Sequence, residues 1–406
     1  MNILDIITKK KNNEELTYEE LSFAFNGYNK GEVKDYQMSS LLMAITINGM
    51  SLKETLSLTD IFIKSGETYE FKKKVSDKHS TGGVGDTTSL IVAPIVASMN
   101  IPMAKMSGRS LGHTGGTVDK LESIPGYKVE LTKEEFYNQI NKLGLAICSQ
   151  TDNLVPLDKV IYALRDVSGT TESIPLIACS IMSKKIASGA YYIVIDIKVG
   201  SGALIKTKAE AEIFSEWVIK IGDAYKRKVK TIISPMDNPL SLSIGNSLEV
   251  LEAIEVLKGK NNKLKETSVL LAAHIVSMAK GISVDDAKIL SNNALKKGSA
   301  YKMFEKWIEA QGGDLNKIKV SKNVFFLKSN VTGTIQSISA INCGKLATKL
   351  GAGKLTKDSK IDHGVGIKIL HSVGSKVKKG EPLAEIYVKD FDIKLNPEDL
   401  ELFVIK

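Results

Sequence analysis

Two short segments concentrate the residue types that bind anions. Residues 76–89 read SDKHSTGGVGDTTS, and residues 105–117 read KMSGRSLGHTGGT. Each combines a Lys with hydroxyls and with glycines, which let the backbone approach a ligand closely. One apolar stretch of helical length joins them. The first segment lacks the order of both the Walker loop and the dinucleotide fingerprint. The pair therefore predicts two walls of one anion pocket.

Arginine is rare in this chain, which makes each one informative. Among 55 basic residues only Arg109, Arg165 and Arg227 are Arg. Because the chain otherwise uses Lys, an Arg indicates a position that requires the planar, bidentate hydrogen bonding of a guanidinium. Arg109 and Arg165, in Gly- or Ser-rich surroundings, are functional candidates, whereas Arg227 in KRKVK is expected at the surface. The two acidic residues of VDKLE, at 119 and 122, could hold a metal, although pairing with loop cations is favoured.

The elements that must position these residues follow from local patterns. Residues 1–65 are expected to be helical, with the capping boxes Thr17–Glu20 and Ser51–Glu54; a third box, Thr132–Glu135, opens another helix. Apolar or β-branched runs at 145–148, 191–197 and 229–234 predict strands, and 208–222 and 247–258 predict helices. Strands that alternate with helices indicate an α/β fold with a mixed, largely parallel sheet.

Three domains are expected. A small, discontinuous helical domain takes 1–65 plus 158–188, and an α/β phosphate-binding domain takes 70–157 plus 189–330. Residues 331–406 alternate strands with Gly turns and predict a C-terminal α+β domain, similar to half of a biotinyl/lipoyl hammerhead and structural in role.

Composition excludes several classes of protein. Hydrophobic residues make up 43% and charged residues 25%, which is the ordinary globular mixture. No apolar run approaches 18 residues, and three scattered cysteines predict neither a disulfide framework nor a zinc site. The net charge of +9 comes from Lys with few aromatics, so a solvated surface is favoured over nucleic-acid binding. A cytoplasmic protein is expected, with no nucleic-acid or membrane partner.

The two anion segments resemble the pyrimidine-nucleoside phosphorylases, a family that includes thymidine phosphorylase. The resemblance rests on KHSTGGVGD (78–86) and SGRSLGHTGGTVDKLES (107–123). It continues through QTDNLVPLDK (150–159), YALRDVSGTTESIPLIACSIMSKK (162–185), IDIKVGSGA (195–203) and IGNSLEVLEA (244–253). The sequence departs at Ser110, where the family carries Gly or Ala. His113, in the same segment, is expected to be structural.

The resemblance implies cleavage of thymidine, uridine or deoxyuridine by phosphate, which gives the free base and (deoxy)ribose 1-phosphate. It implies a phosphate-binding set of Lys78, Ser80, Ser89, Lys105, Ser107 and Thr117. It implies that Arg165, Ser180 and Lys184 bind the base and that His79 lies over the sugar and base; these four form the catalytic set. Arg165 and Lys184 would stabilise negative charge on the leaving pyrimidine. Phosphate, already anionic, needs no general base.

The resemblance also implies a monovalent cation and a dimer. Bacterial members bind potassium, and the matching residues here are Gly85, Thr87, Leu240, Ser243 and Glu252. No organic cofactor is expected. A homodimer with contacts between helical domains is expected, with the active site in the cleft between domains.

Two alternatives remain open at this stage. One is glycosyl transfer like that of anthranilate phosphoribosyltransferase, which needs an acidic patch for magnesium and pyrophosphate that the sequence does not offer near the sugar site. The other is a non-catalytic nucleic-acid binder, indicated only by the basic charge.

Overall fold

A computed structural model describes residues 1–109, 115–354 and 359–406. The chain forms two compact units. Unit 1 comprises 1–77, 151–193 and 212–230, and unit 2 comprises 78–150, 194–211 and 231–406. Helix α10 (Lys208–Ala224) lies mostly in unit 1, whereas the sequence analysis placed it in the α/β domain. The C-terminal residues belong to unit 2, whereas the sequence analysis gave them a third domain.

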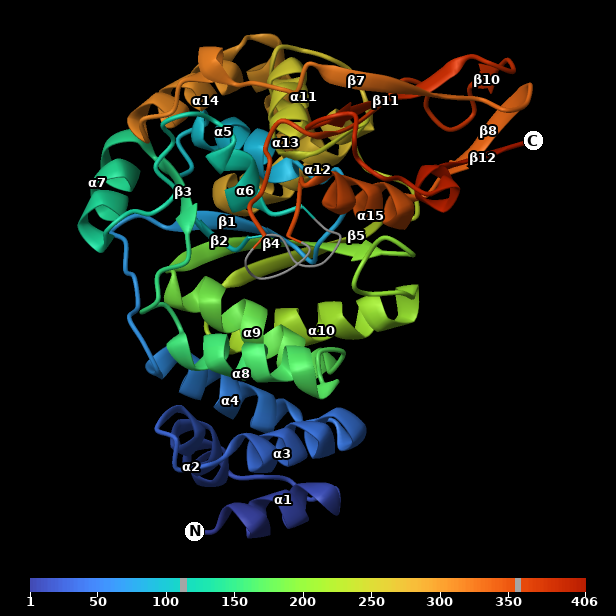
Figure 1. Ribbon diagram of the computed structural model, residues 1–406. Coiled ribbons are helices and arrows are strands. Elements are labelled where there is room, and N and C mark those ends of the chain that lie inside the picture. Colours follow the sequence, from blue (N-terminus) through green and yellow to red (C-terminus); the bar gives the residue numbers. More distant parts are fainter. Residues whose placement is uncertain (110–114, 355–358) are drawn as a thin grey trace. The chain divides into compact units, whose positions relative to one another are not determined.

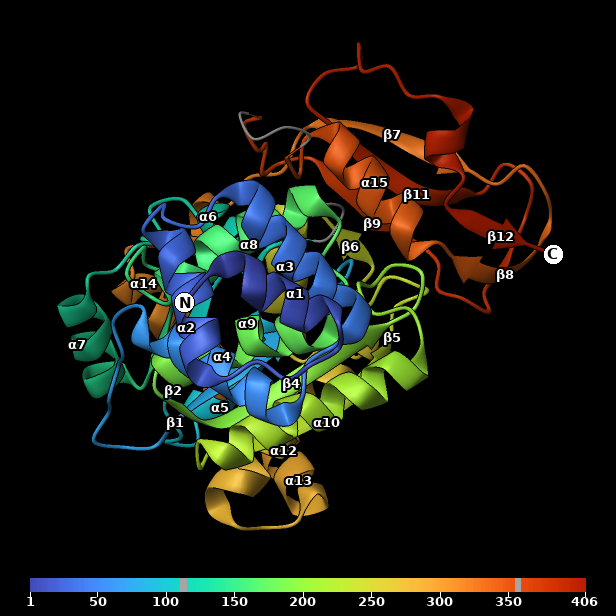
Figure 2. The same ribbon diagram turned by 90° about the horizontal axis from the view of Figure 1, so that it is seen from below.

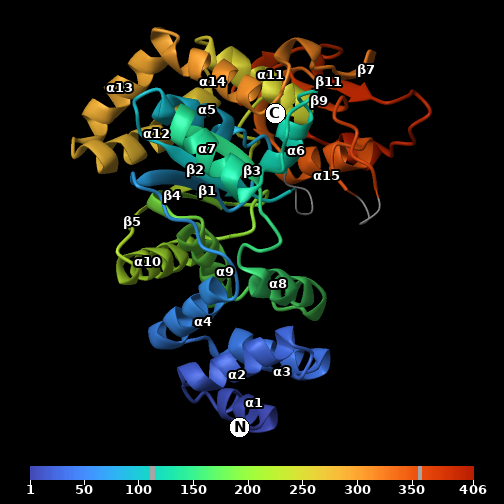
Figure 3. The same ribbon diagram turned by 90° about the vertical axis from the view of Figure 1, so that its left-hand side faces the viewer.

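Unit 1 is built from stacked helices (Figures 1 and 3). Besides α10, they are α1 (Ile3–Lys11), α2 (Tyr18–Asn29), α3 (Asp35–Asn48), α4 (Leu52–Lys64), α8 (Pro156–Ser168) and α9 (Ile174–Ala187). Helix α4 packs on α2 and α9, and α3 packs on α1 and α8. The expected helical segment at 158–188 is therefore two helices, and residues far apart in the sequence share one core.

Both capping boxes predicted for the N-terminal helices are present. Thr17 accepts a hydrogen bond from the Glu20 amide at 3.2 Å, and Ser51 accepts one from the Glu54 amide at 3.1 Å, with both glutamates reaching back to the cap. In unit 2 the third box holds between Thr132 and Glu135 and opens α7 (Lys133–Leu143). Local pairing of a hydroxyl with an orphan amide fixes where these helices begin.

A five-stranded sheet has the order β3-β2-β1-β4-β5, and β2 and β3 pair in parallel. Its strands are β1 (Val75–Ser80), β2 (Met103–Ser107), β3 (Leu145–Ser149), β4 (Ala190–Val199) and β5 (Lys228–Pro235). Every residue of α5 (Thr88–Ala97) is buried, and α5 packs against α12 and α14 in unit 2. The predicted α/β class is confirmed, and residues 76–80 of the first anion segment form a strand that the sequence patterns did not predict.

The remaining elements of unit 2 follow in order. The helices are α6 (Thr117–Glu122), α11 (Asn246–Leu257), α12 (Lys263–Lys280), α13 (Val284–Lys296), α14 (Ser299–Ala310) and α15 (Ala340–Leu350), with 3-10 turns at Leu315–Lys317 and Pro397–Leu400. The strands are β6 (Ser243–Ile244), β7 (Asn323–Lys328), β8 (Gly333–Ile338), β9 (Gly366–Ile369), β10 (Lys376–Val377), β11 (Pro382–Val388) and β12 (Phe403–Ile405). The region 263–310 is helical, which the sequence patterns did not resolve.

The C-terminal strands form two antiparallel sheets. One has the order β6-β9-β11-β7 and the other β10-β8-β12. Figure 2 shows α15 lying beside β9 and β11. The expected α+β character of 331–406 is confirmed, although β6 comes from a segment that precedes this region by many residues.

Among the described residues, no single helix is long and apolar enough to cross a membrane; α12 and α13 meet the test only as a pair, bent by 116°.

A buried ion pair ties the start of the chain to α4. Lys10 Nζ lies 2.9 and 3.0 Å from the two carboxylate oxygens of Glu54, and both side chains are almost fully buried. Glu54 also accepts hydrogen bonds from the amides of Leu16 and Ser51. A second ion pair, Lys53–Glu15, joins the same two segments but is exposed to solvent, so it can be compared with the buried pair.

We expect Glu54→Ala to lower the stability of unit 1 by about 3–5 kcal/mol, because it leaves the Lys10 ammonium buried without its carboxylate. Glu15→Ala removes an exposed pair and should cost less than about 1 kcal/mol. Thermal unfolding of both variants measures the difference. Equal shifts of the two midpoints would contradict the role given to the buried pair.

Candidate active site

Four buried charged groups lie together at the start of the first anion segment. Lys78 on β1 is 1% exposed, donates to Thr88 Oγ1 at 2.6 Å, and lies 3.8 Å from a carboxylate oxygen of both Asp86 and Asp196. Lys198 on β4 lies 2.7 Å from Asp196 and 3.8 Å from Asp86. Burial lowers the pKa of Lys78, while both carboxylates act in the opposite direction. The cluster balances two ammoniums with two carboxylates.

Asp86 organises the hydroxyls of this segment. It accepts hydrogen bonds at 2.5 Å from Ser80 Oγ and Thr88 Oγ1, and at 3.3 Å from the Thr88 amide. Burial opposes ionisation, yet the ammoniums of Lys198 and Lys78 hold the pKa of the Asp86 carboxyl well below its usual range. Asp86 is therefore a carboxylate that fixes the groups predicted to bind phosphate.

The other predicted phosphate-binding residues lie at element ends in unit 2. Ser89 is in the first turn of α5, where helix N–H groups favour an anion. Lys105 on β2 donates from Nζ to the Lys78 carbonyl at 2.6 Å, which joins the two predicted walls. Ser107 ends β2, and Thr117 begins α6. His79 lies between Lys78 and Ser80 on β1, so strand alternation turns its side chain to the other face.

The turn between β1 and α5 is held by a second buried network. Thr87 Oγ1 donates to Glu249 Oε2 at 2.6 Å, and Lys120 Nζ lies 2.7 Å from the same oxygen while donating to the Asp86 carbonyl at 2.7 Å. Gly85 has φ +65°, and a Cβ there would meet Ser241 Oγ at 2.6 Å. Only glycine fits both this backbone conformation and this close approach.

The predicted cation ligands lie around that turn. The Leu240 amide donates to the Val84 carbonyl, and the Ser243 carbonyl accepts from Ser241 Oγ. Glu252 on α11 is 2% exposed; its Oε1 accepts from Asn262 Nδ2 at 2.9 Å. Its Oε2 is buried and has no hydrogen-bond partner among the described residues, and burial raises the pKa of Glu252. As cation ligands these residues would offer backbone carbonyls, a hydroxyl and a carboxylate, the oxygen ligands that a hard cation prefers.

The predicted base-binding residues gather in unit 1, on α8 and α9. Arg165 is 1% exposed; its Nε donates to the Thr170 carbonyl at 3.1 Å and its Nη2 to the Thr171 carbonyl at 3.0 Å. Burial lowers the pKa of Arg165. Ser180 Oγ donates to Asp158 Oδ2 at 3.0 Å, and Lys184 Nζ lies 2.6 Å from the same oxygen. Ser180 therefore bonds to a side chain of another helix.

The phosphate set and the base set thus lie in different units, and the predicted cleft that unites them stays a prediction. Arg109 is confirmed as a carboxylate partner: it forms a bidentate pair with Glu122 and lies 3.2 Å from Asp119. Arg227, expected at the surface, is half-buried, and burial lowers its pKa. Ser110 and His113 lie outside the described residues.

Sequence reasoning missed the buried partners of the predicted residues. These are Asp86, Lys120, Asp158, Asp196, Lys198 and Glu249. All six lie inside the family-like segments, and a charge flanked by apolar residues, as in IDIKV, was the available signal.

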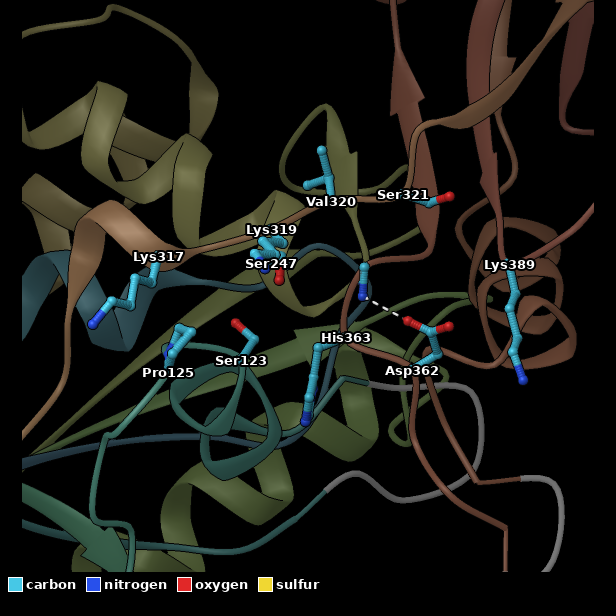
Figure 4. A pocket seen from close by; sticks show the side chains of 11 residues that line it. Ser123, Pro125, Ser247, Lys317, Lys319, Val320, Ser321, Asp362, His363 and Lys389 are labelled. Carbon is cyan, nitrogen blue, oxygen red and sulfur yellow. Dashed lines mark hydrogen bonds between the residues drawn. The ribbon is translucent and has the colours of Figure 1, made fainter.

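A pocket of about 630 Å³ lies in unit 2 apart from the predicted residues (Figure 4). It is lined by Ser123, Pro125, Ser247, Lys317, Lys319, Val320, Ser321, Asp362, His363, Gly364 and Lys389. None of these residues was predicted to bind substrate. The side chains of Lys317 and Lys389 lie at opposite ends of the pocket and do not converge on a common point.

Three known domain families match successive parts of the chain. A glycosyl transferase family helical bundle domain matches 4–66, a glycosyl transferase family a/b domain matches 72–301, and the pyrimidine nucleoside phosphorylase C-terminal domain matches 334–398. The solved structure of anthranilate phosphoribosyltransferase from Thermus thermophilus has a TM-score of 0.62 and 17% identity, with 76% of this chain and 99% of that chain covered. That likeness concerns the fold alone.

Curated relatives extend the match to nearly the whole chain. Pyrimidine-nucleoside phosphorylase from Geobacillus stearothermophilus is 47% identical over 399 residues, which covers 95% of this chain and 92% of the relative. The protein of the same name from Bacillus subtilis (strain 168) is 46% identical with the same coverage, and that from Staphylococcus aureus (strain N315) is 44% identical over 97% of this chain and 93% of the relative. Identity of 44–47% over 95–97% of the chain places it in the pyrimidine-nucleoside phosphorylase family.

Proposed function

We propose that this protein catalyses the phosphorolysis of pyrimidine nucleosides, with thymidine, uridine and deoxyuridine as candidate substrates. The observation that carries the proposal is identity of 44–47% to relatives named pyrimidine-nucleoside phosphorylase over 95–97% of the chain. Phosphate would form a bond to C1′ of the sugar as the bond from C1′ to the base nitrogen breaks. The products would be the free base and (deoxy)ribose 1-phosphate, and the enzyme would be a pentosyltransferase.

The phosphate set suits an anionic nucleophile. Its members are Lys, Ser and Thr side chains, which donate charge-assisted hydrogen bonds to a dianion. Lys78 is held in place by Thr88 and faces Asp86 and Asp196, so its ammonium has one fixed position. The N-terminus of α5 adds its partial positive charge beside Ser89. Phosphate bound here would be oriented rather than activated by a base.

The base set suits a leaving group that gains negative charge. An Arg and a Lys directed at the pyrimidine carbonyls would stabilise that charge in the transition state. Both Arg165 and Lys184 lie near the buried carboxylate of Asp158, and Ser180 supplies a hydroxyl beside them. His79 would donate a hydrogen bond or proton in the sugar–base region. No covalent intermediate is required.

Release of base from thymidine, uridine and deoxyuridine, with and without phosphate and with metal chelator present, tests the activity. We expect release that requires phosphate and tolerates loss of divalent metal. Release that requires magnesium and pyrophosphate would instead support a phosphoribosyltransferase-like reaction, for which the likeness in fold is the only support. Binding to DNA at low salt, without either reaction, would favour the nucleic-acid alternative.

We also propose a monovalent-cation site, with potassium as the candidate ion, at Gly85, Thr87, Leu240, Ser243 and Glu252. The support is the buried Glu252 Oε2, which has no hydrogen-bond partner among the described residues. A cation there would neutralise a carboxylate whose pKa burial raises. It would also hold the turn that carries Asp86 and Thr88 by coordinating backbone and side-chain oxygens.

Potassium should raise the thermal unfolding midpoint of the wild-type protein more than an equal concentration of a large organic cation, because only a bound ion stabilises the folded state specifically. Glu252→Gln should abolish this difference, while Glu255→Gln, an exposed residue of the same helix, should retain it. The same midpoint shift in both variants would rule out Glu252 as a ligand.

We further propose a homodimer and a cytoplasmic location. Unit 1 exposes apolar side chains on α1 and α3, with Leu4 58%, Tyr36 71% and Ile47 74% exposed, and these two helices pack side by side. Exposed apolar side chains on two neighbouring helices would suit an association surface. Cys148, Cys179 and Cys343 are all free and buried, which suits a reducing compartment.

The two residue sets predict separable kinetic defects. Arg165→Lys keeps charge but loses the fork geometry, so kcat/KM for nucleoside should fall about 30- to 1000-fold, the equivalent of about 2–4 kcal/mol, with little change in phosphate KM. Lys78→Met should raise phosphate KM steeply and leave the affinity for a pyrimidine unchanged. Initial rates with phosphate and nucleoside varied independently measure both effects.

Lys260→Met removes an exposed ammonium of unit 2 and serves as the control, with wild-type constants expected. Equal loss of phosphate and nucleoside affinity in both the Arg165 and the Lys78 variant would contradict the assignment of one residue to the base and the other to phosphate.

A further inference from the structure

One buried carboxylate holds two of the three base-binding candidates in unit 1. Asp158 is the third residue of α8, and its side chain is 3% exposed. Its Oδ2 accepts a hydrogen bond from Ser180 Oγ at 3.0 Å and lies 2.6 Å from Lys184 Nζ. A single oxygen atom therefore fixes the hydroxyl and the ammonium relative to each other.

Helical spacing explains how one residue reaches both. Ser180 and Lys184 are one turn apart on α9 and so lie on the same face, which turns toward α8. Arg165 lies two turns after Asp158 on α8, again on the same side. Burial lowers the pKa of Arg165, and the Asp158 carboxylate acts against that lowering. Asp158 thus influences all three residues of the base set.

The backbone just before Asp158 is held in an uncommon conformation. Val155 has φ 51° and ψ 53°, a left-handed conformation that β-branched residues rarely adopt, and its side chain is 1% exposed. Pro156 follows as the first helical residue, and the Asp158 amide donates to the Val155 carbonyl at 3.1 Å. Such strain persists only where the surroundings dictate it. The start of α8, and with it Asp158, therefore has one position.

An acidic residue in the first turn of a helix commonly serves only to stabilise the helix dipole. A carboxylate exposed to solvent is sufficient to stabilise the helix dipole. Asp158 is instead buried and directed at two side chains of another helix. Burial of a carboxylate costs free energy unless an opposite charge and hydrogen-bond donors lie beside it. The geometry goes beyond what helix stability requires.

We propose that Asp158 is a positioning residue for the nucleoside, which it serves by orienting Ser180 and Lys184 toward the pyrimidine. This inference rests on the proposed function. Asp158 touches neither substrate nor phosphate in this role, so its loss acts on the nucleoside through Ser180 and Lys184 and leaves the phosphate set of unit 2 intact.

Asp158→Asn removes the ion pair with Lys184 and keeps the shape of the side chain. We expect kcat/KM for nucleoside to fall about 10- to 100-fold, because small misplacement of a charged group weakens transition-state stabilisation strongly. Phosphate KM should stay within about twofold of wild type, since only an interaction with nucleoside is lost. Asp60→Asn breaks the ion pair with the exposed Lys64 in the same unit, away from the base set, and should leave both constants unchanged.

A double-mutant cycle with Lys184→Met separates positioning from a purely structural role. If Asp158 acts in part through Lys184, adding Asp158→Asn to Lys184→Met should cost less than it costs in the wild-type protein, because the ion pair with Lys184 is already absent and only the contact with Ser180 is left to lose. Additive losses, or an equal rise in nucleoside and phosphate KM, would overturn the inference. Isothermal titration of uracil to the same variants gives a binding measurement that is independent of turnover.

The cycle also separates this inference from the function on which it rests. Absence of phosphorolysis in the wild-type protein would refute the proposed function, and a wild-type nucleoside KM in Lys184→Met would refute the base assignment. If Lys184→Met alone is impaired, an unimpaired Asp158→Asn refutes the role of Asp158. Should Asp158→Asn fail to fold, Asp158→Glu, which keeps the charge but shifts the oxygen, should show the same selective nucleoside defect, and wild-type kinetics there would refute the inference.

Discussion

Two ammoniums and two carboxylates removed from water must neutralise one another, and the phosphate-binding side of this protein is built around that requirement. Lys78, Asp86, Asp196 and Lys198 are all almost fully buried. Removing any one would leave an uncompensated charge, which is far more costly than the intact cluster. The cluster joins β1, the turn before α5 and β4, so the electrostatic constraint also fixes the backbone that presents Ser80 and Ser89.

The same principle operates on the nucleoside side. Asp158 is a lone carboxylate buried between α8 and α9, and Lys184 and Ser180 satisfy it. In each unit, some of the residues expected to touch substrate are held by a buried carboxylate: Lys78 and Ser80 in unit 2, and Ser180 and Lys184 in unit 1. Fixed donors need little reorganisation when charge develops, which is the main source of electrostatic catalysis. The buried carboxylates therefore fix the positions of Lys78, Ser80, Ser180 and Lys184.

Much of the local structure could be predicted because its causes are local. The three capping boxes depend on a hydroxyl and a Glu three residues apart, and all three hold. The strand at 75–80 was missed because SDKHS is polar; it is a strand because it lies between β2 and β4 in the middle of the five-stranded sheet. The unit boundaries differ from the expected ones for a related reason: of the five, those after residues 77, 193 and 230 fall inside strands and that after 211 falls inside α10, where no Gly- or Pro-rich linker marks them.

The sequence by itself determined the family, the α/β class and the identity of the substrate-binding candidates, because spacing and residue type within short segments carry that information. Only the tertiary structure decided which charges pair. Lys184 reaches Asp158 across 26 positions and Lys78 faces Asp196 across more than a hundred, so no local pattern reveals either contact. Burial sets the pKa directions of Lys78 and Glu252, and the neighbouring ammoniums of Lys198 and Lys78 set that of Asp86; both causes are likewise properties of the packed chain.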